Sequence, residues 1–167
     1  DPNNAQYGLA ALSYKTDYAY NYSVSDRMRL LNTYNDYVAR FPNDATLRMN
    51  RAVMMDRVGL ISGALAEYKN MTGNRTAQVA NNRGVALLKT NRITEAEYEF
   101  TEAVRMDPNL AEAHYNLGIV NAYKGMTDRA VEHLSTALNL RADLKADIAT
   151  NPVFAVMRQN PKFARFR

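Results

Sequence analysis

The sequence has neither cysteine nor tryptophan, and its 167 residues include only 7 glycines and 5 prolines. Without cysteine, the chain can form no disulfide and no thiolate metal site, which leaves the cellular compartment open. It also has no apolar run of the ~18 residues that a membrane-spanning helix needs. A hydrophobic content of 47% in a chain of this length is enough for one helical domain and leaves no room for a second.

What the sequence does contain is a repeat of fixed length. Residues 77–110 and 111–144 are adjacent blocks of 34 residues. Their coincident residues are Gly84 with Gly118, Ala96 with Ala130, Phe100 with Leu134, and Ala103 with Ala137. Such a period is typical of stacked helical units, because two short helices cannot bury an apolar face alone.

Two less regular copies precede these blocks. Gly59 aligns with Asn91 and Gly125, which places one copy at about 45–76. Residues 5–44 are interpreted as a degenerate, expanded first repeat. The four residues before it have the pattern of the end of a further repeat, so we expect the chain to be a fragment of a longer protein.

The pattern resembles the tetratricopeptide repeat (TPR) family, whose signature is W-x2-L-G-x2-Y, A-x3-F, then A and P. Leu117-Gly118 supplies the L-G pair, Ala96-x3-Phe100 the A-x3-F element, and Asp107-Pro108 the closing pair. In the second block His114 takes the Trp position and Asn121 the Tyr position. The resemblance implies an all-α, right-handed α-solenoid of helix-turn-helix repeats. The expected helices are approximately 45–58, 61–72, 77–90, 94–106, 111–124 and 128–140.

Local signals mark the ends of these helices. Thr94-x-x-Glu97 has the pattern of a capping box, and Asp128 is predicted to cap the equivalent helix one repeat later. The segments 151–155 and 160–164 each begin with Asn-Pro, a helix-start signal. We therefore expect 145–167 to form a helical cap on the last repeat, with apolar contacts from Phe154, Phe163 and Phe166.

The net charge of +4 arises from one region. Residues 141–167 hold six basic and two acidic residues, a balance of +4, so the remainder is neutral. A solvated basic surface is the simpler interpretation, with an acidic partner as the alternative.

No catalytic, cofactor or metal site is predicted. The two histidines, His114 and His133, lie on different expected helices, and His114 is interpreted as a core residue. The chain has no H-E-x-x-H, P-loop or G-x-G-x-x-G motif. The carboxylates at 95, 97, 99 and 102 are interpreted as a solvated helix face.

The resemblance also implies where a ligand binds, because the first helix of each TPR repeat lines a concave groove. The sixth position of successive repeats is Asn50, Asn82 and Asn116, a row of amides suited to the main chain of an extended peptide. Bridging of neighbouring helices is the alternative role. The accompanying groove residues are predicted to be Met49, Val53, Asn81, Val85, Tyr115, Ile119 and Tyr123. The basic clamp positions of chaperone-binding TPR domains are aliphatic, neutral or acidic here.

Seven of the 11 tyrosines lie within the first 37 residues, where they can serve an interface or pack against a preceding repeat. The leading functional hypothesis is a non-enzymatic scaffold that binds an extended peptide or partner protein. The alternative is a homo-oligomerisation module, and nucleic-acid binding ranks third because the repeats are neutral. The wealth of Asn and Tyr without Cys favours a bacterial envelope protein; the partner itself stays unidentified.

Overall fold

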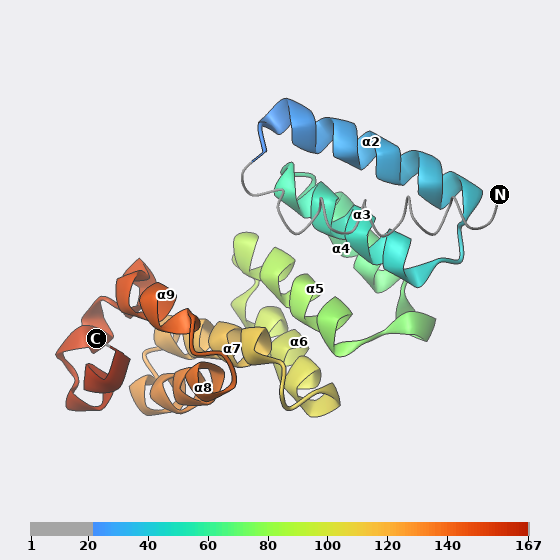
Figure 1. Cartoon of the computed structure of the whole chain (residues 1–167). Helices are drawn as coiled ribbons and strands as arrows, with labels where there is room; N and C mark the ends of the chain where they lie inside the picture. Colours follow the sequence, from blue (N-terminus) through green and yellow to red (C-terminus); the bar gives the residue numbers. More distant parts are fainter. Residues whose placement is uncertain (1–21, 167) are drawn as a thin grey trace. The chain divides into compact units, whose positions relative to one another are not determined.

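The computed structural model describes residues 22–166 (Figure 1). These residues form helices and turns without a β-strand, so the all-α prediction is confirmed. The chain divides into two compact units, residues 1–75 and 76–167. This division falls one residue before a predicted repeat boundary. The expectation that 1–167 is one domain stays a prediction.

The first unit holds one long helix and one helical hairpin. Its elements are α2 (Val24–Arg40), α3 (Ala45–Arg57), α4 (Ile61–Lys69) and the 3-10 turn η2 (Thr72–Asn74). Asp44 begins α3 as an N-cap whose carboxylate accepts a hydrogen bond from the Leu47 N–H, at 2.9 Å. Tyr34 is fully buried in the core between α2 and α3. The predicted first repeat is only partly observed, since its tyrosines before residue 22 lie outside the described residues.

The second unit holds two helical hairpins followed by a C-terminal segment (Figure 1). Its long helices are α5 (Ala77–Lys89), α6 (Ile93–Met106), α7 (Ala111–Tyr123) and α8 (Thr127–Leu140). Each begins and ends within one residue of its predicted bound. By contrast, α4 ends three residues before the predicted position.

Each hairpin of the second unit is closed by a glycine facing a large side chain. A Cβ added to Gly84 would lie 2.5 Å from Cε1 of Phe100, and one added to Gly118 would lie 2.6 Å from Cδ2 of Leu134. Real Cβ atoms do not approach other atoms so closely. Both positions therefore require glycine, which has no side chain. The predicted superposition of Gly84 on Gly118 therefore corresponds to the same close approach in space.

The turn between the two helices of each hairpin contains one residue in the left-handed conformation. Gly59, Asn91 and Gly125, which align in the sequence, have φ of 88°, 59° and 71°. This conformation favours Gly and tolerates Asn. In the second unit the backbone N–H groups of Arg92 and Met126 donate to carbonyls five residues earlier, at 3.0 and 2.8 Å.

The predicted side-chain caps of α6 and α8 are wrong. Both helices begin one residue earlier than predicted, with Arg92 and Met126 at the N-cap and no side-chain cap bond. Thr94 and Asp128 therefore lie inside the first turn. Because each turn passes directly into the next helix, the backbone itself positions the helix start.

The predicted C-terminal cap is confirmed. It consists of α9 (Leu144–Thr150) and three 3-10 segments: η3 (Pro152–Phe154), η4 (Val156–Gln159) and η5 (Pro161–Phe166). The side chains of Asn151 and Asn160 accept from the N–H groups two residues later, at 3.0 and 2.9 Å. The three phenylalanines of this segment are fully buried in one core with residues of α7 and α8.

Among the described helices, none has both the length and the apolar character that crossing a bilayer demands. The same residues hold no cluster of three or more metal-ligating side chains.

Candidate peptide-binding surface

The three predicted amides lie on the first helices of their hairpins, as expected. Asn50 belongs to α3 in the first unit and is buried, with 8% of its surface exposed. Asn82 on α5 and Asn116 on α7 belong to the second unit, and both are half-buried. A half-buried amide can be oriented by its neighbours and still contact a ligand.

Asn116 is held by a hydrogen bond that joins two repeats. Its Nδ2 donates to Oδ1 of Asn81 at 2.9 Å, and Asn81 on α5 is itself buried. The bridging role that sequence left open is therefore real for Asn116. Because an amide has two N–H donors and one acceptor oxygen, this bond leaves one N–H and the Oδ1 of Asn116 for other partners.

Asn82 is in a different situation from its neighbour Asn81. Its side chain makes no hydrogen bond within the described part of the chain, although it is half-buried. Val85, one turn further along α5, is also half-buried. Together they form a partly covered strip with polar and apolar parts on one helix.

The structure places Tyr115 against the C-terminal segment. Its hydroxyl accepts a hydrogen bond from Nδ2 of Asn151 at 2.8 Å, and its ring meets Phe154 edge-on with centroids 6.2 Å apart. The pKa of Tyr115 is raised overall, chiefly by burial and also by the nearby Asp147 carboxylate, while the hydrogen bond from Asn151 acts in the opposite direction. Ile119 is also packed against this C-terminal core. Both residues thus have partners inside the chain.

The other predicted contact residues remain partly accessible. Met49 and Val53 on α3 are half-buried. Tyr123, at the end of α7, is 61% exposed, which makes it one of the most accessible large side chains of the second unit. Glu112, at the start of α7, is paired with Arg141 after α8.

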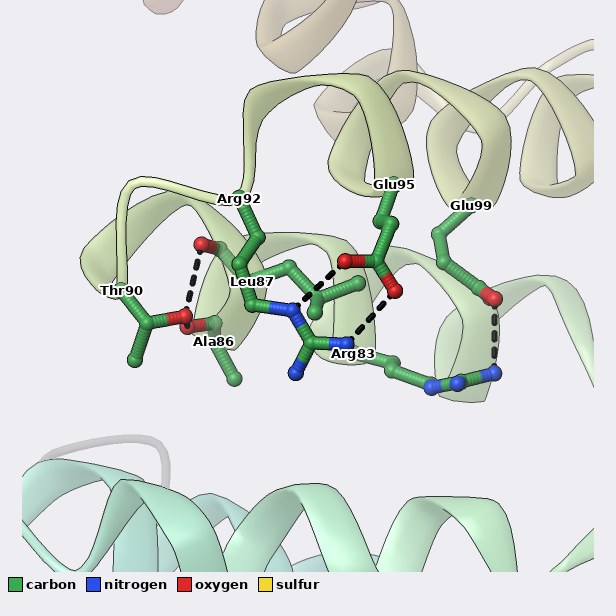
Figure 2. Close-up of polar contacts among 7 residues, drawn as sticks. All are labelled: Arg83, Ala86, Leu87, Thr90, Arg92, Glu95 and Glu99. Carbon is green, nitrogen blue, oxygen red and sulfur yellow. Dashed lines mark hydrogen bonds and ion pairs between the residues drawn. The ribbon is translucent and has the colours of Figure 1, made fainter.

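Sequence reasoning missed ion pairs between the helices of two hairpins, each formed by a buried carboxylate and a partly exposed arginine. On α6, Glu99 is only 3% exposed and accepts from Nη1 of Arg83 at 2.7 Å (Figure 2). The solvated-face interpretation is therefore wrong for Glu99. The first unit has the same arrangement, with Glu67 bonded to Arg51 and to Arg48. The signal was present, since Arg51–Glu67 and Arg83–Glu99 have the same spacing of 16 residues.

In the last hairpin His133 takes the position of Glu67 and Glu99, whereas Leu117 takes the position of Arg51 and Arg83. His114 is buried, as predicted for a core residue, and its Nδ1 lies 3.3 Å from Nδ1 of His133. The two rings are tilted by 38°. Sequence reasoning kept these residues apart, because only the packing of α7 on α8 brings them together.

Comparison with known families identifies one matching repeat model. The TPR repeat model matches residues 84–125, which run from the middle of α5 to the turn after α7. The match includes Gly84, Gly118 and Gly125, three of the residues that carry the repeat pattern.

Solved structures with a similar fold cover most of this chain at low identity. YrrB, described as a TPR protein with an unusual peptide-binding site, is 17% identical, with a TM-score of 0.62 over 90% of this chain and 78% of YrrB. MamA from Desulfovibrio magneticus RS-1 is 18% identical, with a TM-score of 0.64 over 81% and 76% of the two chains. A tetratricopeptide repeat protein from Parabacteroides merdae ATCC 43184 is 16% identical, with a TM-score of 0.65 over 95% and 63%.

Proposed function

Because the chain is a tetratricopeptide repeat protein, with a fold that generally serves as a protein–protein interaction scaffold, we propose that it binds an extended peptide. In the second unit the ligand lies along the first helices of the repeats, α5 and α7, and in the first unit α3 is the equivalent helix. The ligand is a segment of a partner protein, and the protein has no catalytic role in this proposal. The peptide-binding description of YrrB is consistent with it, although the identity is only 17%.

The observation that carries this proposal is the bond from Asn116 to Asn81. It fixes the orientation of a half-buried amide on α7, so a donor and an acceptor are in place before a ligand arrives. Preorganisation of this kind lowers the entropy lost on binding. Asn82, half-buried on α5 and without a side-chain partner among the described residues, offers a second amide in the same unit.

The C-terminal segment sets a limit to this surface in the second unit. The Tyr115 hydroxyl is already hydrogen-bonded to Asn151, and the Tyr115 ring already packs edge-on with Phe154. We therefore place the ligand over Asn82, Val85 and Asn116, with Tyr123 as an exposed aromatic contact. In the first unit, Met49, Asn50 and Val53 are the corresponding contacts.

The probes for this proposal are peptides from a random displayed library, selected for binding to the parent protein. A net hydrogen bond contributes about 0.5–1.5 kcal/mol, so the triple variant N50A/N82A/N116A should bind well over tenfold more weakly. The loss should be similar for peptides of different sequence, because the amides contact the main chain.

The matched control is Asn139→Ala, an exposed amide on α8. It should leave the affinity unchanged, and circular dichroism should show equal helix content in all variants. Binding of the triple variant at parental strength would place the ligand elsewhere.

Self-assembly is a second candidate, favoured by exposed apolar side chains on the second unit. These are Tyr98, Met106, Tyr123, Met126, Leu140 and Val156. Light scattering over a range of protein concentrations tests it. A constant molecular mass of one chain would exclude it, whereas a mass that rises with concentration would support it.

A further inference from the structure

Both histidines of the chain meet in one place. His114 on α7 and His133 on α8 approach through their Nδ1 atoms, 3.3 Å apart. His114 is 8% exposed and His133 is half-buried. Histidine is the side chain that changes charge near neutral pH, so this hairpin carries a titratable pair between its helices.

The hydrogen-bond partners define where the protons lie. Nε2 of His114 is 3.1 Å from the carbonyl oxygen of Pro108, which can only accept, so this nitrogen carries the proton. Neutral His114 therefore accepts at Nδ1. The proton between the two rings then belongs to His133, whose Nδ1–H donates to His114.

The other hairpins hold residues of fixed charge or no charge at these positions. The equivalents of His114 and His133 are Arg48 and Glu67 in the first unit, which form an ion pair at 2.7 Å. In the hairpin α5–α6 they are Ala80 and Glu99. Among the described hairpins, only α7–α8 joins its helices through two histidines.

We propose that the His114–His133 pair makes the α7–α8 hairpin pH-sensitive, closed at neutral pH and loosened by mild acid. One added proton can be placed on Nε2 of His133 while the bond between the rings is kept. A second proton must go to Nδ1 of His114, which sets two N–H groups and two positive charges against each other. The bond between the helices is then lost.

The surrounding charges favour loss of stability on acidification. Burial and His114 lower the pKa of His133, Glu132 raises it and Arg129 lowers it, so the balance is downward. These groups come from α8 itself and from α7, the helix packed against it. The unfolded chain, with histidine near its usual pKa of about 6.5, binds protons more readily than the folded hairpin. Stability is therefore complete above that pH and decreases as the pH falls below it.

Hydrogen–deuterium exchange resolved by peptide tests this proposal on the whole chain, in buffer containing a chelator. Peptides from α7 and α8 report on the pair, and peptides from α5 and α6 are the internal control for the direct effect of pH on exchange. Between about pH 7.5 and about pH 5.5, protection of α7 and α8 should fall about fivefold relative to the control, the equivalent of one lost hydrogen bond.

Two variants separate this effect from a general response to acid. His133→Gln places an amide at this position that can donate to neutral His114 and, after rotation, accept from protonated His114, so the bond survives acidification. H114R/H133E installs the residues of the first unit's hairpin. Both should abolish the relative loss of protection. NMR titration of the parent should give a pH midpoint for His133 below 6.5.

Two results would overturn the proposal. One is equal protection of α7 and α8 at both pH values in the parent, and the other is the same pH dependence in the parent and in whichever variant folds. The test does not involve a ligand, so its outcome is independent of the peptide-binding proposal.

Discussion

The hairpins α5–α6 and α7–α8 have the same backbone closure but different interiors. In both, a glycine of the first helix admits a large side chain of the second, Phe100 in one and Leu134 in the other. Between the helices, however, α5–α6 has a buried ion pair, Arg83 with Glu99, whereas α7–α8 has two histidines. The close approach of two helices thus constrains the small and large residues strictly, while the polar contact beside it is free to change between repeats.

The largest effect is expected from breaking the ion pair of α5–α6. Arg83→Met would leave Glu99 charged and buried, which costs about 3 kcal/mol, the lower end of the usual range because 28% of the Arg83 side chain is exposed. The double variant R83M/E99L should recover most of this loss. Urea unfolding followed by circular dichroism measures both. A double variant no more stable than R83M would show that the pair is not the cause.

The two glycines should respond differently to the same substitution. Gly84→Ala forces a methyl group against the ring of fully buried Phe100, so we expect a loss of about 1–3 kcal/mol. In Gly118→Ala the methyl group meets Cδ2 and Cγ of Leu134, a smaller side chain than phenylalanine, and the loss should be about half as large. The urea midpoints of the two variants test this order. Equal midpoints would mean that the ring and the leucine adapt equally well.

A stabilising change is expected at Asn121 in α7. This residue is 3% exposed, its Oδ1 has no partner among the described residues, and its Nδ2 donates to the Leu117 carbonyl. The equivalent residue of α5 is Leu87, also buried. Asn121→Leu should therefore stabilise the protein by about 1 kcal/mol, because it removes a buried acceptor that lacks a donor. A lower melting temperature would contradict this.

The smallest effect is expected for the second ion pair of α5–α6. Arg92 and Glu95 form two hydrogen bonds, at 2.7 and 2.6 Å, but both are exposed to solvent (Figure 2). The pair raises the pKa of Arg92 and lowers that of Glu95. Solvent screening makes such a surface pair contribute little, so Glu95→Gln should leave the urea midpoint unchanged within error. A shift comparable to that of R83M would contradict the distinction between buried and exposed pairs.

The C-terminal segment shows how far prediction from sequence extends. The two Asn-Pro signals correctly placed the turns at Asn151 and Asn160, and the three phenylalanines are buried as expected. The contact of this segment with Tyr115 was not predicted, because Tyr115 was interpreted as a groove residue. Nothing in the local pattern indicates that residue 151 reaches a side chain 36 positions earlier.

The sequence alone determined the repeat register, the bounds of the four long helices of the second unit, the recurring small and large residues, and the alignment of the turn residues at 59, 91 and 125. These features follow from local sterics, which impose the same residue type at the same position in every repeat. The tertiary structure decided the polar contacts: Arg83 with Glu99, His114 with His133, and Asn116 with Asn81. Each depends on which side chains of two packed helices point at one another across a few ångströms, and a sequence period records positions along the chain, not that juxtaposition.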